Sequence, residues 1–363
     1  MKILVINPGS TSTKIAVFED ERNLFTDNIE HSQAELAKFS SVFDQLEMRA
    51  EILKQSLRKH GFRGEDFAAA VGRGGGLPGV QAGAYLVTLP LLNTLQFAPQ
   101  IDHASNIGAF LAHIMAEPFK MEAYIYDAIT VDELEPIARV TGLKEMSRRS
   151  QGHMLNMRAA AIKKAKDEDR AYGDLTMIVA HMGGGTTLSI HHKGRIIDMI
   201  SDDEGPFSPE RAGGLPGFQL MDMAFSGEYD YKALFRKVAR QGGLMSHFGT
   251  TDAKAVLQMM KDGDEKAALV LEAMCHNVAK NIGKLAVVTR GKVDHIVLTG
   301  GLAHSKVFTG WIEDRVSFLA PVTIIAGENE MESLALGALR VLKGEENAKI
   351  YEPPFPLKQP AGA

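Results

Sequence analysis

The 363-residue chain contains a single cysteine, Cys275, so an internal disulfide is impossible. That cysteine lies in an apolar helical pattern, which predicts a buried and unreactive thiol. No apolar run approaches the length of a membrane-spanning helix, and the formal net charge of −5 argues against nucleic-acid binding. The start, Met1-Lys2 followed by four apolar residues, is too short for a signal peptide. We therefore expect a reduced cytoplasmic protein that binds neither membranes nor nucleic acids.

The G-x-x-x-x-G-K-[ST] pattern of the P-loop is also absent, but residues 3–18 have another phosphate-loop pattern. Four apolar residues are followed by Asn7-Pro8-Gly9, by hydroxyl side chains at residues 10–13, by Lys14 and by a second apolar run. This order predicts a buried strand, a tight turn and a returning strand. An ordinary hairpin with a polar tip would look similar, but dense hydroxyls beside a glycine and a lysine favour a loop that binds phosphate.

Residues 177–190 repeat this arrangement in the second half of the chain. An apolar strand leads into Gly183-Gly184-Gly185, then into two threonines and an apolar return. One such loop is weak evidence, whereas two of them half a chain apart indicate a duplicated core that binds a nucleotide.

The length of the chain predicts two domains. The chain is longer than one hydrophobic core usually serves, and its 45% apolar and 23% charged residues are typical of globular proteins.

Ser32 and Glu35 form a capping-box pattern at the start of an expected helix. Helices are expected over residues 32–60, about 102–117, 265–290 and 334–342, with a further one opening at Ser147.

Two arginines each precede a similar glycine loop. Arg73 leads Gly-Gly-Gly-Leu-Pro-Gly, and Arg211 leads Ala-Gly-Gly-Leu-Pro-Gly. Residues 74–79 also match G-x-G-x-x-G, but a strand-like segment follows at 84–88 instead of a helix, so a dinucleotide site is rejected. An arginine beside an open glycine loop can bind a carboxylate or phosphate with two hydrogen bonds. The alternative is a surface arginine in a common Gly-Pro loop.

Several other polar residues have both a functional and a structural interpretation. Asp127 follows a strand, where carboxylates often face a ligand, but it could equally cap a turn. His153 lies where a helix opens, and a lone histidine there is most often packed or on the surface. His191-His192 indicate a metal only weakly, and a solvated hairpin is the simpler interpretation. Residues 202–204 have the composition of an exposed acidic turn.

Two strands in the last quarter of the chain end in features suited to a ligand. The strand that begins near Asp294 runs into Gly300-Gly301, where two glycines allow a flat group such as adenine to approach the backbone. The strand at 324–326 ends in the acidic residues Glu328 and Glu330.

The two hairpin loops and Leu298-Thr299-Gly300-Gly301 together resemble the acetokinase family. That family belongs to the superfamily of sugar kinases, actin and heat-shock chaperone ATPases. The resemblance implies an α/β fold with two duplicated ribonuclease-H-like domains, each a mixed sheet flanked by helices, and an ATP cleft between them. It places the acyl-substrate domain at residues 1–146 and the nucleotide-binding domain at 147–330. A C-terminal helix, about 331–363, returns to the first domain.

The resemblance also implies a set of site residues, which are named here by the role that each would have. Catalytic roles fall to Arg73, Asp127, His153 and Arg211. Mg²⁺ would be held by Asn7 and Glu330, with Glu328 and Glu332 as alternatives for the acid. ATP would contact Ser10, Ser12 and Lys14 in the first loop, His181, Gly183, Gly184 and Gly185 in the second, and Asp252, Gly300 and Gly301.

The implied reaction is transfer of phosphate from ATP to a short fatty acid, giving ADP and an acyl phosphate. Acetate kinases have an asparagine in a His-x-Gly-Asn-Gly loop, whereas this chain has Gly184 there. Butyrate or a branched relative is therefore the expected substrate. The resemblance also implies that the protein is a homodimer or a higher homo-oligomer. Several alternatives stay open. The chain could be an acetate or propionate kinase of the same family, or a sugar or polyol kinase that uses Asp127 as a base. It could also be a chaperone- or actin-like ATPase or a non-catalytic scaffold.

Overall fold

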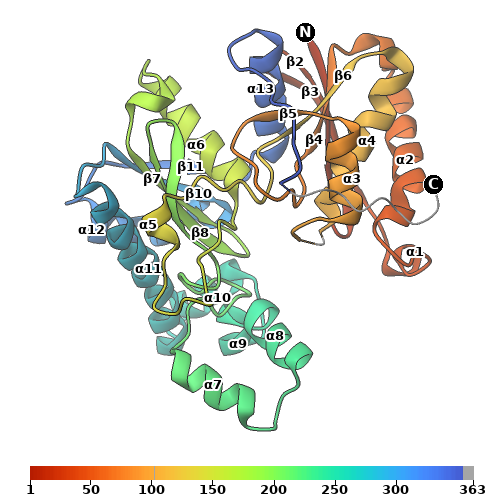
Figure 1. Cartoon of the computed structure of the whole chain (residues 1–363). Coiled ribbons are helices and arrows are strands. Elements are labelled where there is room, and N and C mark those ends of the chain that lie inside the picture. The colour runs from red at the N-terminus through yellow and green to blue at the C-terminus, as the bar shows by residue number, and fades with distance from the viewer. Residues whose placement is uncertain (102, 355–363) are drawn as a thin grey trace. The chain divides into compact units, whose positions relative to one another are not determined.

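The computed structural model describes residues 1–101 and 103–354, which form two compact units (Figure 1). Unit 1 comprises Met1–Asp132 and the segment from Asn329 onward, and unit 2 comprises Glu133–Glu328. The domain limits at residues 146 and 330 stay a prediction, and the compact units divide at different residues. The segment after Asp132 belongs with unit 2 because the Glu133 carboxylate accepts a hydrogen bond from the Ile196 amide.

Unit 1 is built on a six-stranded mixed sheet in the order β3-β2-β1-β4-β6-β5. Strands β1, β2 and β3 form an antiparallel meander, β4 and β6 continue in parallel with β1, and β5 is antiparallel at the edge. The central strand is apolar on both faces because helices cover both. The strands span Lys2–Pro8 (β1), Ser12–Glu19 (β2), Arg22–Glu30 (β3), Ala69–Arg73 (β4), Ala84–Leu86 (β5) and Glu122–Tyr126 (β6).

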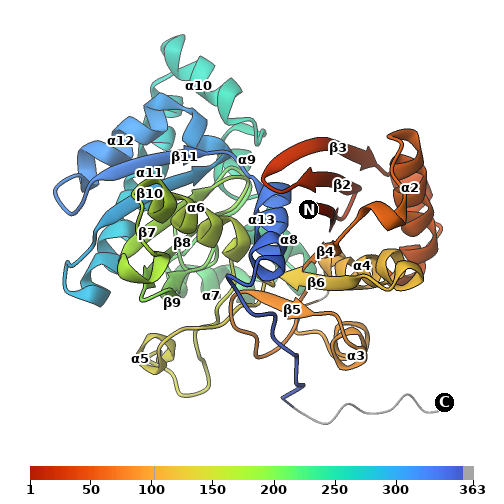
Figure 2. The same ribbon diagram turned by 90° about the horizontal axis from the view of Figure 1, so that it is seen from above.

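The helices of unit 1 pack on the two faces of this sheet. Helix α13 packs against β1 and β4 on one face, and α4, backed by α2, covers the other (Figure 2). The side chains of Leu4 and Ile6 join Leu53 and Leu111 in one buried cluster. The helices span Gln33–Leu36 (α1), Leu46–Lys59 (α2), Leu89–Phe97 (α3), Gly108–Ala116 (α4) and Glu330–Leu342 (α13).

Two expected helices differ from the structure. The capping box at Ser32 and Glu35 is confirmed, but the helix predicted over 32–60 is broken into α1 and α2. The break occurs where Asp44 accepts hydrogen bonds from the Ser40 hydroxyl and the Ser41 amide, a local alternative to helical hydrogen bonds. The helix predicted from about 102 is α4 preceded by a 3-10 turn, and Asp102 lies outside the described residues.

Unit 2 repeats the topology of unit 1. Its sheet has the order β11-β10-β7-β8-β9, with β7, β8 and β9 as an antiparallel meander and with β10 and β11 parallel to β7. The same three-strand meander and parallel extension in both units confirm the duplicated α/β fold. The strands span Met177–Met182 (β7), Thr186–His192 (β8), Arg195–Ile200 (β9), His295–Gly300 (β10) and Val322–Ala326 (β11).

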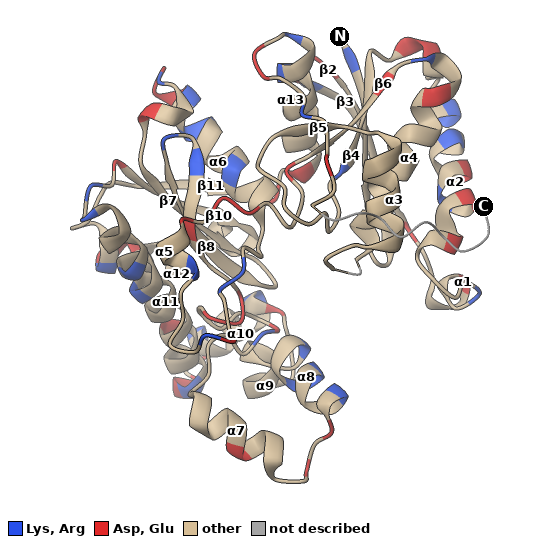
Figure 3. Cartoon of the chain, in the orientation of Figure 1, with Lys and Arg blue, Asp and Glu red and all other residues tan. Residues whose placement is uncertain are grey.

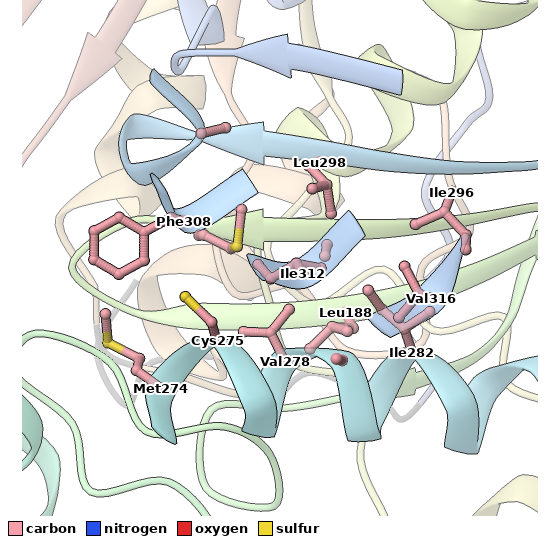
Figure 4. Close-up of a cluster of buried hydrophobic side chains, with 14 of the residues drawn as sticks. Leu188, Met274, Cys275, Val278, Ile282, Ile296, Leu298, Phe308, Ile312 and Val316 are labelled. Atoms are coloured by element: carbon pink, nitrogen blue, oxygen red, sulfur yellow. The ribbon is translucent and has the colours of Figure 1, made fainter. Parts of the chain in front are cut away.

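The core of unit 2 lies between its sheet and α11. Leu188 and Leu298 on the strands pack against α11 and α12 (Figure 4). Cys275 of α11 is buried there, and burial raises its thiol pKa to about 12, as expected for an unreactive cysteine. The helices span Pro136–Arg139 (α5), Met154–Asp167 (α6), Gly217–Phe225 (α7), Tyr231–Arg240 (α8), Gly243–Phe248 (α9), Ala253–Lys261 (α10), Glu265–Ala286 (α11) and Lys306–Val316 (α12).

The helix expected to open at Ser147 is α6, which begins only after His153. Among the helices in residues 1–101 and 103–354, none combines the length and apolar character needed to cross a membrane.

Candidate active site

The first hairpin loop joins β1 to β2 at residues 9–11. The register pairs Pro8 with Thr13, and the Gly9 amide donates a 2.8 Å hydrogen bond to the Ser12 carbonyl. Ser10 and Thr11 are exposed at the tip. The strand, turn and return expected from the sequence are therefore present, and the loop presents hydroxyl groups that could bind an anion.

A partly buried polar cluster in unit 1 brings three of the expected site residues together. Asn7 Nδ2 donates to Glu330 Oε2 at 2.6 Å, and Arg73 NH2 lies 3.0 Å from Glu330 Oε1. The Asn7 Oδ1 atom and the Arg73 Nε atom are buried without a hydrogen-bond partner in the described part of the chain. Unsatisfied buried groups are costly, so these two atoms favour the binding of a polar ligand beside the cluster.

Mg²⁺ fits the oxygen atoms of this cluster. Asn7 Oδ1 and the Glu330 carboxylate could supply two oxygen ligands, and Mg²⁺ usually binds one or two such groups from the protein. The described residues contain no group of three or more His, Cys, Asp or Glu side chains that could hold a metal. A Mg²⁺ ion held by Asn7 and Glu330 would take its remaining ligands from water and phosphate oxygens.

Asp127 lies beside this cluster along the sheet. It follows β6, where Tyr126 pairs with Arg73 of β4, so the two candidates lie at the carboxyl ends of neighbouring parallel strands. Asp127 is 2% exposed, and its Oδ1 accepts a 2.6 Å hydrogen bond from the Gly83 amide. Its φ of 41° lies in the left-handed region, which a non-glycine residue adopts at a cost. The structure therefore holds this carboxylate in a defined position.

Two histidines stack beside the second hairpin loop, in unit 2. His181 is the penultimate residue of β7, a strand that is buried throughout, and the ring of His153, at the start of α6, stacks on it at a centroid distance of 4.0 Å. His153 Nδ1 is 2.9 Å from the Thr187 hydroxyl, which holds the ring in place. Both ring nitrogens of His181 lack a hydrogen-bond partner among the described residues, although Nε2 is 3.4 Å from Glu328 Oε1. The lone histidine expected at 153 is thus half of a pair.

The glycines of the second loop make room for side chains from other segments. A Cβ atom on Gly185 would lie 2.5 Å from Arg211 NH1, and one on Gly183 would lie 2.7 Å from Glu328 Oε1. Gly184 is exposed, its carbonyl accepts a 2.6 Å hydrogen bond from the Ser208 hydroxyl, and a Cβ atom there would lie 3.4 Å from Glu210 Oε1. Arg211, Glu328 and His181 therefore surround the loop within unit 2.

The expectation of an exposed acidic turn at residues 202–204 is wrong for two of its three residues, because only Asp203 is exposed. Asp202 forms an ion pair with Arg211, and Glu204 Oε2 accepts from Arg148 Nε at 2.9 Å. Burial lowers the pKa of Arg211 below its usual value, but a guanidinium stays charged at neutral pH. The turn holds Arg211 in place.

The interpretation of the His191-His192 hairpin as solvated is wrong at His191, which is fully buried. Its Nδ1 lies 2.6 Å from the Tyr172 hydroxyl and its Nε2 2.8 Å from the Ser189 hydroxyl. Burial lowers its pKa to about 3, so the ring is neutral at physiological pH. It is a core residue.

Two of the nucleotide-side candidates, Asp252 and Gly300, have local structural roles, whereas Gly301 does not. Asp252 is exposed and caps α10 by accepting from the Lys254 amide at 2.9 Å. Gly300 has φ 89°, and a Cβ there would collide with the Met182 backbone, so this glycine is required by strand packing. Gly301 is exposed with open space around its Cβ position. Of these three, Gly301 has the surroundings expected for a ligand contact.

The fold of this chain also occurs in a kinase of known structure. The structure is similar to the crystal structure of Porphyromonas gingivalis acetate kinase, with a TM-score of 0.79 over 94% of this chain and 99% of that one. At 15% sequence identity this likeness shows the fold alone.

Sequence comparison defines the family. Butyrate kinase 1 and butyrate kinase 2 of Clostridium acetobutylicum are 43% and 45% identical to this chain over 353 residues, which are 97% of this chain and 99% of each relative. Residues 148–310 match the model of the acetokinase family. The chain belongs to the acetokinase family.

Proposed function

We propose that this protein transfers the γ-phosphoryl group of ATP to the carboxylate of a short fatty acid, with butyrate or a branched relative as the substrate. The observation that carries the proposal is the 43–45% identity to two butyrate kinases over nearly the whole chain. The partly buried cluster of Asn7, Arg73 and Glu330 and the stacked histidines support it, because they are suited to metal and phosphate binding.

The chemistry requires charge stabilisation more than proton transfer. A carboxylate is already ionised at pH 7, so its oxygen can attack the γ-phosphorus without a base while the bond to the ADP oxygen breaks. The protein must hold two anions together and stabilise the charge on the transferred group. Asn7 and Glu330 would hold Mg²⁺, which when bound neutralises charge on the phosphate oxygens.

Each unit contributes cationic or neutral donors to this task. In unit 1, Arg73 would bind the substrate carboxylate, and Asp127 would orient Arg73 or a water molecule. In unit 2, Arg211 and the two histidines His153 and His181 would contact the phosphoryl group. Such fixed donors lower the barrier because they need no reorganisation as charge develops.

A hydroxylamine trap tests the proposal directly. The purified protein with Mg²⁺, ATP and hydroxylamine should form acyl hydroxamate from C4 acids faster than from acetate, across a panel of C2 to C5 acids. Glycerol and a hexose serve as alcohol controls, assayed by ADP release. Phosphorylation of an alcohol without any hydroxamate would overturn the proposal in favour of a sugar or polyol kinase.

A homo-oligomer in the cytoplasm, where ATP is available, completes the proposal. In α7 and α8 no residue is buried, and Phe218, Phe225 and Tyr231 are 83%, 89% and 81% exposed. Exposed apolar side chains of this number mark an interaction surface. Helix α8 adds basic residues, whereas acidic residues flank it on the preceding loop (Figure 3). Sedimentation velocity on the wild type and on Phe225→Ser would show whether this surface joins copies of the chain.

A further inference from the structure

Arg49 of α2 is a fully buried arginine that lies behind the first hairpin loop. Its Nε and NH2 atoms donate to Gln45 Oε1 at 3.1 and 2.8 Å. Its NH1 atom lies 3.0 Å from the Gly9 carbonyl, 2.9 Å from the Ser12 carbonyl and 3.0 Å from the Thr13 hydroxyl. All of these partners are neutral, and two of them are backbone carbonyls, one in the loop and one at the first residue of β2.

The positive charge of Arg49 is not neutralised by its contacts. No carboxylate contacts its guanidinium among the described residues, and burial lowers its pKa to about 10, which still leaves it protonated at neutral pH. His31, which contacts the Thr13 hydroxyl at 2.8 Å, has its pKa lowered by its own burial and by Arg49. A buried charge without a counter-ion is costly, so its presence suggests that an anion binds nearby.

The loop has an inner side that faces Arg49 and an outer side that is exposed. Because a trans peptide bond directs its C=O and N–H in opposite directions, a Gly9 carbonyl held by Arg49 directs the Ser10 amide away from Arg49. Ser10 and Thr11 are the exposed residues of the loop. Arg49 therefore determines which way the loop presents a backbone donor.

We propose that Arg49 is a positioning residue for the anion bound at the first hairpin loop. Its hydrogen bonds fix the turn from Gly9 to Ser12, and its uncompensated charge attracts a polyphosphate on the exposed side without touching it. The inference rests on the proposed function for the identity of this anion, which is the polyphosphate of ATP.

The sharpest test neutralises the charge without removing the arginine. Gln45→Glu keeps the side-chain shape and places a carboxylate where Gln45 Oε1 now accepts from Arg49. An ion pair would then form, so the variant should be at least as stable to heat as the wild type. ATP should nevertheless bind about 10- to 100-fold more weakly, because the attraction between the buried charge and the polyphosphate is lost.

A matched control and two arginine variants separate charge from structure. Gln55→Glu makes the same change at an exposed position of α2 and should leave ATP binding unchanged. Arg49→Met should weaken ATP binding as Gln45→Glu does, and Arg49→Lys should recover part of it, since lysine keeps the charge but not the planar fork. If Arg49→Met does not fold, Gln45→Glu still decides the question.

The measurement is calorimetric binding of ATP and of adenosine to each folded variant. A loss of charge should weaken ATP binding and leave adenosine within about 2-fold, because adenosine has no phosphate for the buried charge to attract. Equal loss of both ligands, or wild-type ATP affinity in Gln45→Glu, would overturn the inference. ATP binding by the wild type without hydroxamate formation would overturn only the proposed reaction. No ATP binding by the wild type would overturn both.

Discussion

The two hairpin loops share one strand arrangement but differ in how they are held. The loop of unit 1 has exposed hydroxyl residues at its tip and is fixed from its inner side by Arg49. The loop of unit 2 has glycines at residues 183–185 and is surrounded by side chains from distant segments, Arg211 and Glu328 among them. One loop presents its own donors, and the other leaves space for donors that come from elsewhere.

This difference shows what a duplicated sheet determines and what it leaves open. Strand pairing is the same in both units because it depends on main-chain hydrogen bonds and on apolar faces. The loop residues are not part of that pairing, so they can diverge without affecting the fold. The chemical roles proposed for the two units depend on this divergence.

Replacing Arg211 and replacing Arg73 by alanine should change different kinetic constants. The loss of kcat in Arg211→Ala is the largest effect that we expect. Arg211→Ala should lower kcat on the order of 10³-fold with little change in the KM for ATP, because Arg211 would meet charge that develops in the transition state. Arg73→Ala should mainly raise the KM for the acid, because Arg73 would bind the carboxylate equally before and during transfer. Steady-state kinetics with ATP and butyrate varied independently measure both.

The lysine variants sharpen this comparison. Lysine at either position keeps the charge but not the two-pronged donor, so recovery should be partial. Equal losses in kcat for both alanine variants, with the KM for butyrate unchanged, would contradict the division of roles between Arg73 and Arg211.

Adding one methyl group to each loop should separate the two ways of holding it. Gly185→Ala would place a Cβ 2.5 Å from Arg211 NH1 and should lower kcat roughly 100-fold by displacing that side chain. Gly9→Ala is the matched control, since its Cβ would lie 3.3 Å from the Ser12 hydroxyl and 3.5 Å from the Ser12 carbonyl, and kcat should fall less than about 3-fold. A larger loss for Gly9→Ala would show that the first loop is the more tightly packed.

The smallest expected effect compares two glutamates that are two residues apart. Glu330→Gln should raise the Mg²⁺ concentration needed for half-maximal rate about 10-fold and recover at high Mg²⁺, because Glu330 shares a cluster with Asn7. Glu328 lies beside His181 in unit 2, so Glu328→Gln should show no such rescue. Rescue in Glu328→Gln alone would move the metal role to that residue.

Much of the fold was predictable because its signals are local. Apolar runs around a glycine turn predicted both hairpins, and the capping box predicted the start of α1. The break between α1 and α2 was missed because Ser40, Ser41 and Asp44 bond to one another in a way that an apolar period does not show. Thr187, which holds His153, lay in the predicted loop but was not singled out.

The sequence by itself was enough to predict the strands on either side of each hairpin loop, the repetition of that loop and the family. These features depend on neighbouring residues and on overall similarity. Only the tertiary structure decided which glutamate joins Asn7, since Glu328 and Glu330 look alike in sequence but belong to different units. It also decided that Arg49 lies behind a loop 40 residues away in sequence. Such contacts bring together side chains from separate elements, and no local pattern of residues shows which of these elements will meet in the fold.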